Sequence, residues 1–523
     1  MKTLRNDMTT RTGLRIVALA AICAALAGCG GGGGGSSDNG PPPVNGPAWG
    51  SFGRDAQHSA LSGIATQTLA RLLWNTPVDL APQYASDGSL LIHYGSPVIS
   101  AHNTVIVPVR TSGGGVRVEA RAGANGALLW SADSDYVLGA PSASFWTPSY
   151  GVALTPGNRL YFAGADGKMF YRDDVDNPSG SVKTIVAINV PPGSPSAALV
   201  NAALTVDAAG TLYFGLTLDR RFGPSSMVRI ATDGAVTLAS METMVPPLLV
   251  GVARTFPATN SAPALSPDGT TLYAVINGSN GDALTLTTYL VALDSTTLAL
   301  KSRVALLDPV TRLPARVSVN SSASPTVGPD GDVYFGVLES NAPAHNFRGW
   351  LLHFEATLAT ARPPASFGWD DTASVVPATM VPSYTGASPY LLAIKYNNYG
   401  GAGTGDGKNR MAIVDPGAVQ TDTISGQPVM KEVLTILGPT PDSGYPGGVR
   451  EWCINTAAVD PFTRSVLVNS EDGMLYRWNL VTNTFTEKIR LGNEIGEAYT
   501  PTVVGPNGVI YAINNATLYA VGQ

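Results

Sequence analysis

Short apolar runs separated by tight turns repeat along the chain from about residue 96 to its end. The clearest copy spans residues 324–336, where Pro329-Asp330-Gly331 separates two apolar stretches, the second being Val333-Tyr334-Phe335. Proline presets φ and glycine allows a positive φ, which is turn chemistry. The β-branched and aromatic stretch that follows is typical of a sheet. This copy therefore predicts a strand, a tight turn and a second strand.

The same unit recurs through the chain, which predicts one repeat architecture. Two looser copies follow Pro377 and Asn455. A third strand-like run follows each unit, and these runs are Arg117–Ala120, Lys168–Tyr171, Met227–Ile230, Tyr289–Leu293, Trp350–Phe354, Met411–Val414, Met474–Trp478 and Thr517–Ala520. They predict an all-β, eight-bladed β-propeller of four-stranded blades. Seven blades is the alternative, because the repeat around 377–414 is irregular.

The last repeat predicts how the ring closes. The chain stops at Gln523, directly after a third strand, so the eighth blade lacks a fourth strand of its own. Leu72-Leu73-Trp74-Asn75 is a spare strand-like run ahead of the first blade. We expect this N-terminal strand to complete the last blade, which leaves no exposed sheet edge at the junction.

Two motifs resemble those of pyrroloquinoline-quinone-like (PQQ-like) β-propellers. Residues 49–59 read Trp-Gly-Ser-Phe-Gly-Arg-Asp-Ala-Gln-His-Ser, which resembles the segment ahead of the first blade in that family. Ala120, Gly126 and Trp130 resemble its tryptophan-docking motif, in which the Trp packs on the adjacent blade. Other repeats lack the Trp or the Gly. The resemblance covers residues 48–523 and implies a PQQ-like propeller domain.

The N-terminus has the pattern of a bacterial lipoprotein signal. Arg11 and Arg15 precede an apolar run that is shorter than the roughly 20 residues of a spanning helix. The run ends in Leu26-Ala27-Gly28-Cys29, which resembles a lipobox and implies a signal peptide over 1–28 with acyl chains such as palmitate on Cys29. The Gly-, Ser- and Pro-rich stretch 29–47 is then a tether. Gly30 in place of Asp implies an outer-membrane lipoprotein facing the periplasm or the cell surface, with the membrane as a partner.

Composition and motif spacing argue against several partners and kinds of chemistry. A charged fraction of 13% and a net charge of −6 give no footprint for nucleic acid. Cys453 is the one cysteine after Cys29, so the mature chain offers no intramolecular disulfide beyond the lipid site. The five histidines lack zinc-ligand spacing, and Gly-x-Ser-x-Gly is absent.

The main candidate ligand site lies at the entrance of the innermost strand of the seventh blade. Arg450, Glu451, Trp452 and Asn455 come together there, and innermost strands line the channel of a propeller. In quinoprotein dehydrogenases, Glu and Asn hold calcium, an Arg contacts the quinone, an Asp is the base and two adjacent Cys stack on the cofactor. This chain has no adjacent Cys pair. The structural alternative is an Arg450–Glu451 ion pair with Trp452 as packing.

A second, weaker candidate is a calcium site in the Gly-rich loop 401–407. Asp406 and Asn409 are hard oxygen donors, with Asn397 or Asn398 nearby. The alternative is a plain hairpin loop between strands at 390–396 and 410–414. No cofactor is expected, and the sequence does not favour PQQ with calcium.

These features favour a lipid-anchored envelope propeller that binds a small ligand or an envelope protein without catalysis. Its architecture resembles the propeller lipoprotein of the outer-membrane β-barrel assembly machinery. One alternative is a quinoprotein-like oxidoreductase with a quinone in the central channel; the missing Cys pair and missing haem Cys-x-x-Cys-His motif count against it. A further alternative is a hydrolase or lyase that acts on polysaccharide, for which the sequence pairs no carboxylates.

Overall fold

The computed structural model of the protein describes residues 46–84, 88, 90–138, 149–190, 197–246, 254–279, 287–317, 321–493 and 499–523. The predicted signal peptide, Cys29 and the tether up to residue 45 lie outside the described residues. Within the described part, no helix is both long and apolar enough to cross a membrane.

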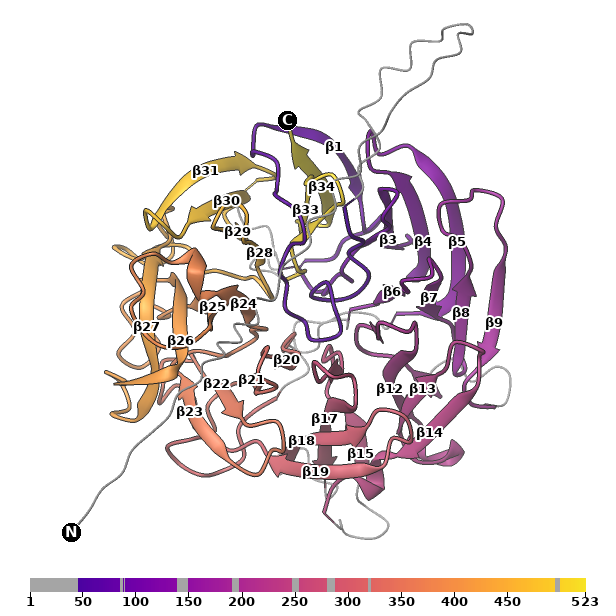
Figure 1. The fold of residues 1–523 in the computed structure, drawn as a ribbon, viewed down its shortest axis with the longest axis horizontal. Coiled ribbons are helices and arrows are strands. Elements are labelled where there is room, and N and C mark those ends of the chain that lie inside the picture. The colour runs from indigo at the N-terminus through magenta and orange to yellow at the C-terminus, as the bar shows by residue number, and fades with distance from the viewer. Residues whose placement is uncertain are drawn as a thin grey trace, which may run out of the picture. The chain divides into compact units, whose positions relative to one another are not determined.

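Eight antiparallel sheets follow one another around a ring, which confirms the eight-bladed prediction (Figure 1). Blade 1 is β2 (Val98–Ile99), β3 (Thr104–Arg110), β4 (Gly115–Ala122) and β5 (Leu128–Val137); blade 2 is β6 (Val152–Leu154), β7 (Leu160–Ala163), β8 (Lys168–Arg172) and β9 (Val182–Val186). Blade 3 is β10 (Ala198–Leu199), β11 (Thr205–Val206), β12 (Leu212–Leu218), β13 (Ser226–Ile230) and β14 (Val236–Ser240); blade 4 is β15 (Arg254–Pro257), β16 (Ala264–Leu265), β17 (Thr271–Ser279), β18 (Thr287–Asp294) and β19 (Leu300–Ala305).

The second half of the ring has the same plan. Blade 5 is β20 (Thr326–Val327), β21 (Val333–Val337), β22 (Trp350–Phe354) and β23 (Ala361–Ala365); blade 6 is β24 (Ser374–Pro377), β25 (Tyr390–Tyr396), β26 (Arg410–Thr421) and β27 (Pro428–Leu437). Blade 7 is β28 (Ala458–Asp460), β29 (Ser465–Asn469), β30 (Met474–Asn479) and β31 (Thr484–Arg490); blade 8 is β32 (Val503–Val504), β33 (Ile510–Asn514), β34 (Thr517–Gly522) and β1 (Arg71–Pro77). Short 3-10 helices occupy Arg220–Phe222, Met241–Thr243 and Ala378–Met380.

Burial falls from the inside of each blade to its outside, as the apolar pattern requires. In blade 7 every residue of β28 and β29 is buried, whereas β31 alternates between exposed and half-buried residues. The turn predicted at Pro329-Asp330-Gly331 is present, with Gly331 at φ +91° and Asp330 accepting a hydrogen bond from the Asp332 amide. The local sequence therefore sets both the strands and the tight turns between them.

The N-terminal strand closes the ring as predicted. β1 pairs antiparallel with β34, from Arg71 opposite Gly522 to Pro77 opposite Thr517. Trp74 packs between blades 8 and 1: its indole Nε1 donates to the Gly123 carbonyl at 2.8 Å, and its ring lies 5.7 Å from that of Tyr511. Gly126 leaves the space for this ring, because a Cβ there would meet Trp74 at 2.7 Å.

The segment before β1 lines the inside of the ring, which the sequence did not predict. We call residues 49–67 the inner belt; it crosses the centre of the ring in Figure 1. Backbone hydrogen bonds of 2.7–2.9 Å connect it to the innermost strands of six blades. They join Trp49 to Ile99, Gly50 to Leu154, Ala56 to Leu265, Gln57 to Val327, Ser59 to Val375 and Ala60 to Val459.

The inner belt also reaches the two other blades. Gln67 donates its amide to the Gly508 carbonyl in blade 8, at 2.8 Å. The buried His58 ring lies 3.5 Å from the Thr205 hydroxyl of blade 3, and its Nδ1 lies 2.7 Å from the Pro325 carbonyl oxygen. Burial lowers the pKa of His58 to about 4, so this ring is neutral at pH 7. A neutral side chain and a backbone segment therefore fill this part of the bore.

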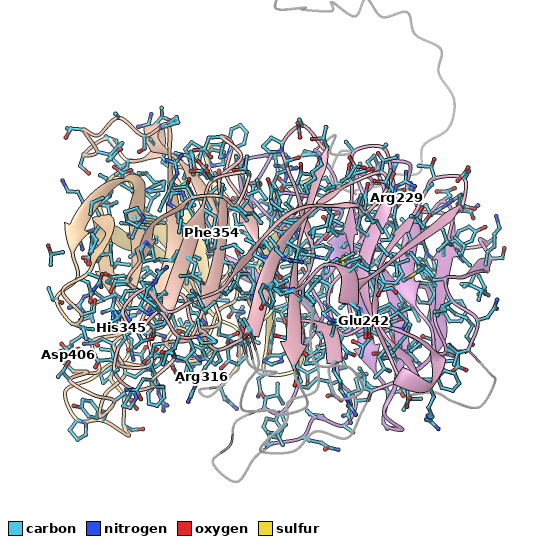
Figure 2. All side chains as sticks on the ribbon, turned by 90° about the horizontal axis from the view of Figure 1, so that it is seen from below. Arg229, Glu242, Arg316, His345, Phe354 and Asp406 are labelled. Carbon is cyan, nitrogen blue, oxygen red and sulfur yellow. The ribbon has the colours of Figure 1, made fainter. Side chains whose placement is uncertain are left out.

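The loops between second and third strands gather on one side of the ring, which we call the loop face. Figure 2 shows His345 and Asp406 from two such loops toward this side, whereas Phe354, at the end of β22, lies toward the other. The loop between β21 and β22 spans residues 338–349, and that between β25 and β26 spans 397–409. The candidate site lies on this face.

The closure predicts how Trp74 contributes to stability. Replacing Trp74, 9% exposed, by Ala removes the interblade packing and the bond to Gly123, and we expect a loss of about 3–5 kcal/mol in the free energy of unfolding. Leu72→Ala on the same strand is the control, because Leu72 is 37% exposed and its loss should cost under about 1 kcal/mol. Urea denaturation measures both. Equal effects of the two substitutions would show that β1 does not close the ring through Trp74.

Candidate functional site

A cavity of about 610 Å³ lies among the loops of blades 5, 6 and 7, with Tyr499 ahead of blade 8 completing its wall. Five aromatic residues line it: Phe347, Trp369, Tyr399, Trp452 and Tyr499. Ligand pockets in proteins typically measure about 300–1,000 Å³ and combine apolar walls with a few converging polar groups. The cavity has the size and the composition of such a pocket.

A buried ion pair forms one side of the cavity. Lys395 comes from β25, is 1% exposed, and places its ammonium 3.9 Å from an Asp370 carboxylate oxygen. Its amide donates to Asp371 at 3.3 Å. Burial raises the pKa of Asp371 to about 8, although Lys395 acts in the opposite direction. One ammonium thus stands against two neighbouring carboxyl groups.

Two further carboxyl groups and a thiol form the opposite corner. Ligand atoms of Glu451, Cys453 and Glu471 all lie within 4.8 Å of one another, and the Cys453 thiol donates to Glu471 at 3.2 Å. Burial, together with the charge of Glu451, raises the pKa of Glu471 to about 8, and burial raises the pKa of Glu451 as well. Their ligand atoms are close enough together to hold a metal ion. Glu451 and Cys453 line the cavity, whereas Glu471 does not.

Below the cavity, polar side chains connect the blades across the centre of the ring. Asn455 donates to the Ser322 hydroxyl at 2.8 Å, which links blade 7 to blade 5. Ser322 donates its hydroxyl to Asp370 at 2.5 Å, and Asn260 donates to the Ser321 carbonyl at 3.0 Å. His93 lies 3.3 Å from the Asn260 amide nitrogen, and burial lowers its pKa to about 4. These bonds and the inner belt therefore connect blades to one another on the inner side of the ring.

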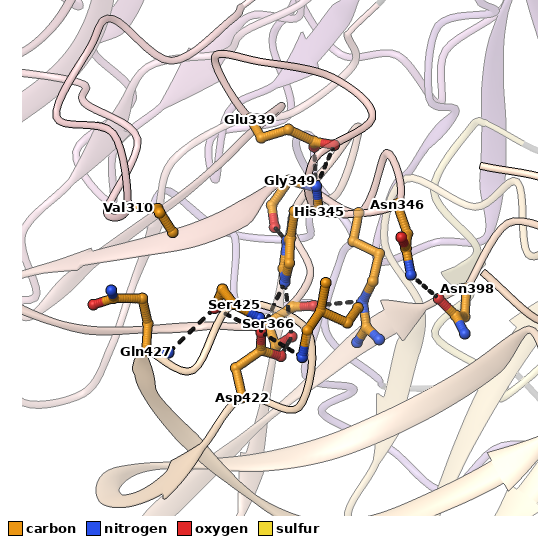
Figure 3. Close-up of polar contacts among 12 residues, drawn as sticks. Val310, Glu339, His345, Asn346, Gly349, Ser366, Asn398, Asp422, Ser425 and Gln427 are labelled. Atoms are coloured by element: carbon orange, nitrogen blue, oxygen red, sulfur yellow. Dashed lines mark hydrogen bonds and ion pairs between the residues drawn. The ribbon is translucent and has the colours of Figure 1, made fainter. Parts of the chain in front are cut away.

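A buried network around His345 fixes the loop that carries Phe347 (Figure 3). The ring stacks on Trp350 at 3.8 Å, with Nδ1 2.9 Å from the Gly349 carbonyl oxygen and Nε2 3.2 Å from Asp422. The Ser366 hydroxyl donates to Asp422 at 2.5 Å. The same hydroxyl lies 3.4 Å from His345 Nε2, and all three side chains are buried. The network positions the loop and is not a nucleophilic triad.

Glu339 holds the same loop from its other side. Its carboxylate accepts hydrogen bonds from the amides of His345, Phe347 and Gly349, at 2.9–3.2 Å. Figure 3 shows this loop folded around the carboxylate. Backbone donors that would otherwise be unpaired are thereby satisfied. Phe347 is presented to the cavity from a rigid support.

The two predicted calcium ligands make hydrogen bonds in and beside the hairpin loop 397–409. Asp406 accepts from Asn398 at 2.7 Å and from the Lys408 amide at 3.0 Å. Asn409 accepts from the Asn398 amide at 2.9 Å and donates to the Val449 carbonyl at 2.8 Å. These bonds order a loop that lines the cavity. Calcium binding at Asp406 and Asn409 stays a prediction.

The candidates from blade 7 separate into three environments. Glu451 and Trp452 reach the cavity, and Asn455 belongs to the polar layer beneath it. The Arg450 guanidinium lies 3.9 Å from both Asp442 and Glu471, so the ion pairs that the structure shows for it are with these residues instead of Glu451. Their role as ligand-binding residues stays a prediction.

Sequence reasoning missed Lys395, the Asp370–Asp371 pair and Glu471. A signal for Lys395 was present, because it is the one charged residue in the otherwise apolar and aromatic strand Tyr390–Tyr396. Glu471 stands in Glu471-Asp472-Gly473, which has the composition of an ordinary turn. Its meeting with Glu451 depends on the loop before β28, which local patterns do not encode.

No protein-family model matches the chain, and no curated protein matches its sequence. Solved structures do match its fold. A europium-containing methanol dehydrogenase aligns over 91% of this chain and 98% of its own, with a TM-score of 0.56 and 10% identity. BamB from Moraxella catarrhalis aligns over 87% of this chain and 99% of its own, with a TM-score of 0.44 and 12% identity. The fold is that of a PQQ-like β-propeller. Identities this low show the fold alone.

The cavity does not fit the quinone cofactor of such dehydrogenases. Pyrroloquinoline quinone is a planar tricarboxylate, so its site has to supply several cationic donors. Of the described residues that line the cavity, Lys395 is the one cation, and it already faces Asp370. Glu451 adds a further acidic group to the wall. The expectation that this propeller works without the quinone stays a prediction.

The raised pKa of Glu471 predicts a pH-dependent stability. Between its ordinary value of 4.5 and about 8, the folded protein holds a proton that the unfolded chain releases, so the free energy of unfolding falls as pH rises. Glu471→Gln removes the ionisable group and therefore this fall in the free energy of unfolding at high pH. We expect the variant to match the parent near pH 4.5 and to exceed it by about 1–2 kcal/mol at pH 8.5, a value reduced for the nearby Arg450.

Urea denaturation at both pH values measures this difference. Glu242→Gln is the matched control, because Glu242 is exposed on blade 3 and should show no such pH dependence. A Glu471→Gln variant that is less stable than the parent at pH 8.5 would show that Glu471 is ionised and stabilised by Arg450.

Proposed function

We propose that this protein is an envelope ligand-binding propeller that holds a small organic molecule in the loop-face cavity and does not transform it. The observation that carries the proposal is the cavity itself. It has ligand size, five aromatic residues in its wall, and acidic and basic groups converging on it. Perturbed carboxyl groups beside a cavity are typical of functional sites.

The supports of the cavity favour binding over catalysis. Loop 338–349 is fixed by Glu339 and His345, and loop 397–409 by Asn398 and Asn409. Pre-organised walls of this kind lower the entropic cost of holding a ligand. The Ser366, His345 and Asp422 side chains are buried and do not line the cavity, so they offer no nucleophile to a bound molecule. The close carboxyl pair, Glu451 and Glu471, does not flank a substrate position, because Glu471 does not line the cavity.

The predicted lipid anchor completes the proposal. A signal over 1–28, acylation at Cys29 and a tether to residue 47 would hold the propeller at the outer membrane, where it samples small molecules of the envelope. A scaffold role for an envelope protein partner is compatible with the ring. The cavity is the feature that a pure scaffold leaves unexplained, so we place ligand binding first.

Occluding the cavity tests the proposal. Ala402 is buried and lines the cavity, so Ala402→Phe should fill part of it. The full-length protein is incubated with a small-molecule extract of the bacterial envelope, separated by gel filtration, and analysed for retained compounds by mass spectrometry. We expect at least one compound to be retained by the parent and to fall at least tenfold with Ala402→Phe. Ala359→Phe, at an exposed turn of blade 5, should retain it fully.

Two results would contradict the proposal. Retention that Ala402→Phe leaves unchanged would place the ligand elsewhere, and recovery of a chemically altered compound would show catalysis. Melting curves of both variants guard against misfolding. If Ala402→Phe does not fold, Tyr399→Ala, which removes a wall ring instead of adding one, is used in its place.

A further inference from the structure

Among the described residues around the cavity, carboxyl groups outnumber basic groups. Five carboxyl groups gather there: Asp370, Asp371, Asp442, Glu451 and Glu471. The basic groups among the described residues that contact them are the Lys395 ammonium and the Arg450 guanidinium, at 3.9 Å from their partners.

The carboxyl groups lie close to one another: Asp370 and Asp371 are neighbours in the chain, and the ligand atoms of Glu451, Cys453 and Glu471 lie within 4.8 Å of one another. Such a site gains more from an entering cation than from a neutral or negative group, because the cation offsets the repulsion between neighbouring carboxylates.

The walls of the cavity favour an organic cation. Aromatic faces attract cations within about 6 Å, and Lys395 already lies 5.9 Å from the centroid of the Tyr499 ring and 6.0 Å from that of Phe367. Phe347, Trp369 and Tyr399 extend this aromatic surface around the cavity. A volume of about 610 Å³ is far larger than a bare metal ion needs. The site can thus hold an ammonium group and an attached apolar body together.

We propose that the cavity binds a protonated organic amine, with its ammonium group at Glu451 and its apolar or aromatic part against Phe347, Trp369 and Tyr399. This inference rests on the proposed ligand-binding function and names the ligand class for the same cavity. Glu451 is the recognition residue, because it lines the cavity and also lies beside Cys453 and Glu471. Lys395, held by Asp370, disfavours a second cation on the other side.

Three probes that share the dansyl group and differ in charge test the charge preference. Dansylcadaverine carries an ammonium group, dansylamide is neutral and N-dansylglycine is an anion at pH 7.5. Fluorescence titration of the full-length protein measures each dissociation constant. We expect dansylcadaverine to bind at least tenfold more tightly than the other two. Glu451→Gln should weaken dansylcadaverine about tenfold and leave dansylamide unchanged, whereas Glu242→Gln should change neither.

The outcomes separate the two proposals. If none of the probes binds, or if Ala402→Phe leaves their binding unchanged, the cavity is not a ligand site and the proposed function fails with the inference. If all three bind without preference for charge, or if Glu451→Gln does not weaken dansylcadaverine, the function stands and the amine inference is wrong. Tight binding of Zn²⁺ that displaces dansylcadaverine and is lost in Cys453→Ser would identify a metal site and also overturn the inference.

Discussion

One backbone segment in the bore holds this ring together. The inner belt donates or accepts a main-chain hydrogen bond at the innermost strands of six blades and reaches blade 8 through Gln67. Each such bond contributes about 0.5–1.5 kcal/mol net, so the set is comparable with the net stability of a folded domain. Several belt residues take positive φ, including Arg54, His58 and Ala60. The pairing with the blades offsets the cost of these conformations.

The belt and the closing strand both keep the ring from opening at a junction between blades. Each blade packs mainly on its neighbours, so a ring without a cross-connection can open at its weakest junction. β1 secures the junction of blades 8 and 1 from outside, and the inner belt joins nearly all blades from inside. Because the ring is secured this way, the loops of blades 5 to 7 need not hold it closed. They can instead shape a cavity with buried carboxyl groups, which are costly to the fold.

The sequence predicts what local chemistry determines. Turn residues such as Asp330-Gly331 and the alternating runs placed the blades, and the unpaired end at Gln523 pointed to Leu72–Asn75 as the closing strand. The belt escaped prediction because its residues pair with strands that lie between 50 (Trp49 to Ile99) and 399 (Ala60 to Val459) positions away and carry no strand pattern of their own. The sequence predicted part of the site, because Glu451 and Trp452 reach the cavity. Lys395 and Glu471 were missed, because they come close to these residues only when the blades are arranged around the ring.

Hydrogen–deuterium exchange of the full-length protein tests the role of the inner belt most directly. The amides of Leu154, Leu265, Val327, Val375 and Val459 donate to belt carbonyls. If the belt holds the ring, peptides that cover these amides and residues 49–67 should exchange together with β34 and β1, at the slow rate set by global unfolding. Fast exchange of 49–67 and of the five amides, while β29 and β33 stay protected, would show that the ring is stable without its belt and would contradict this account.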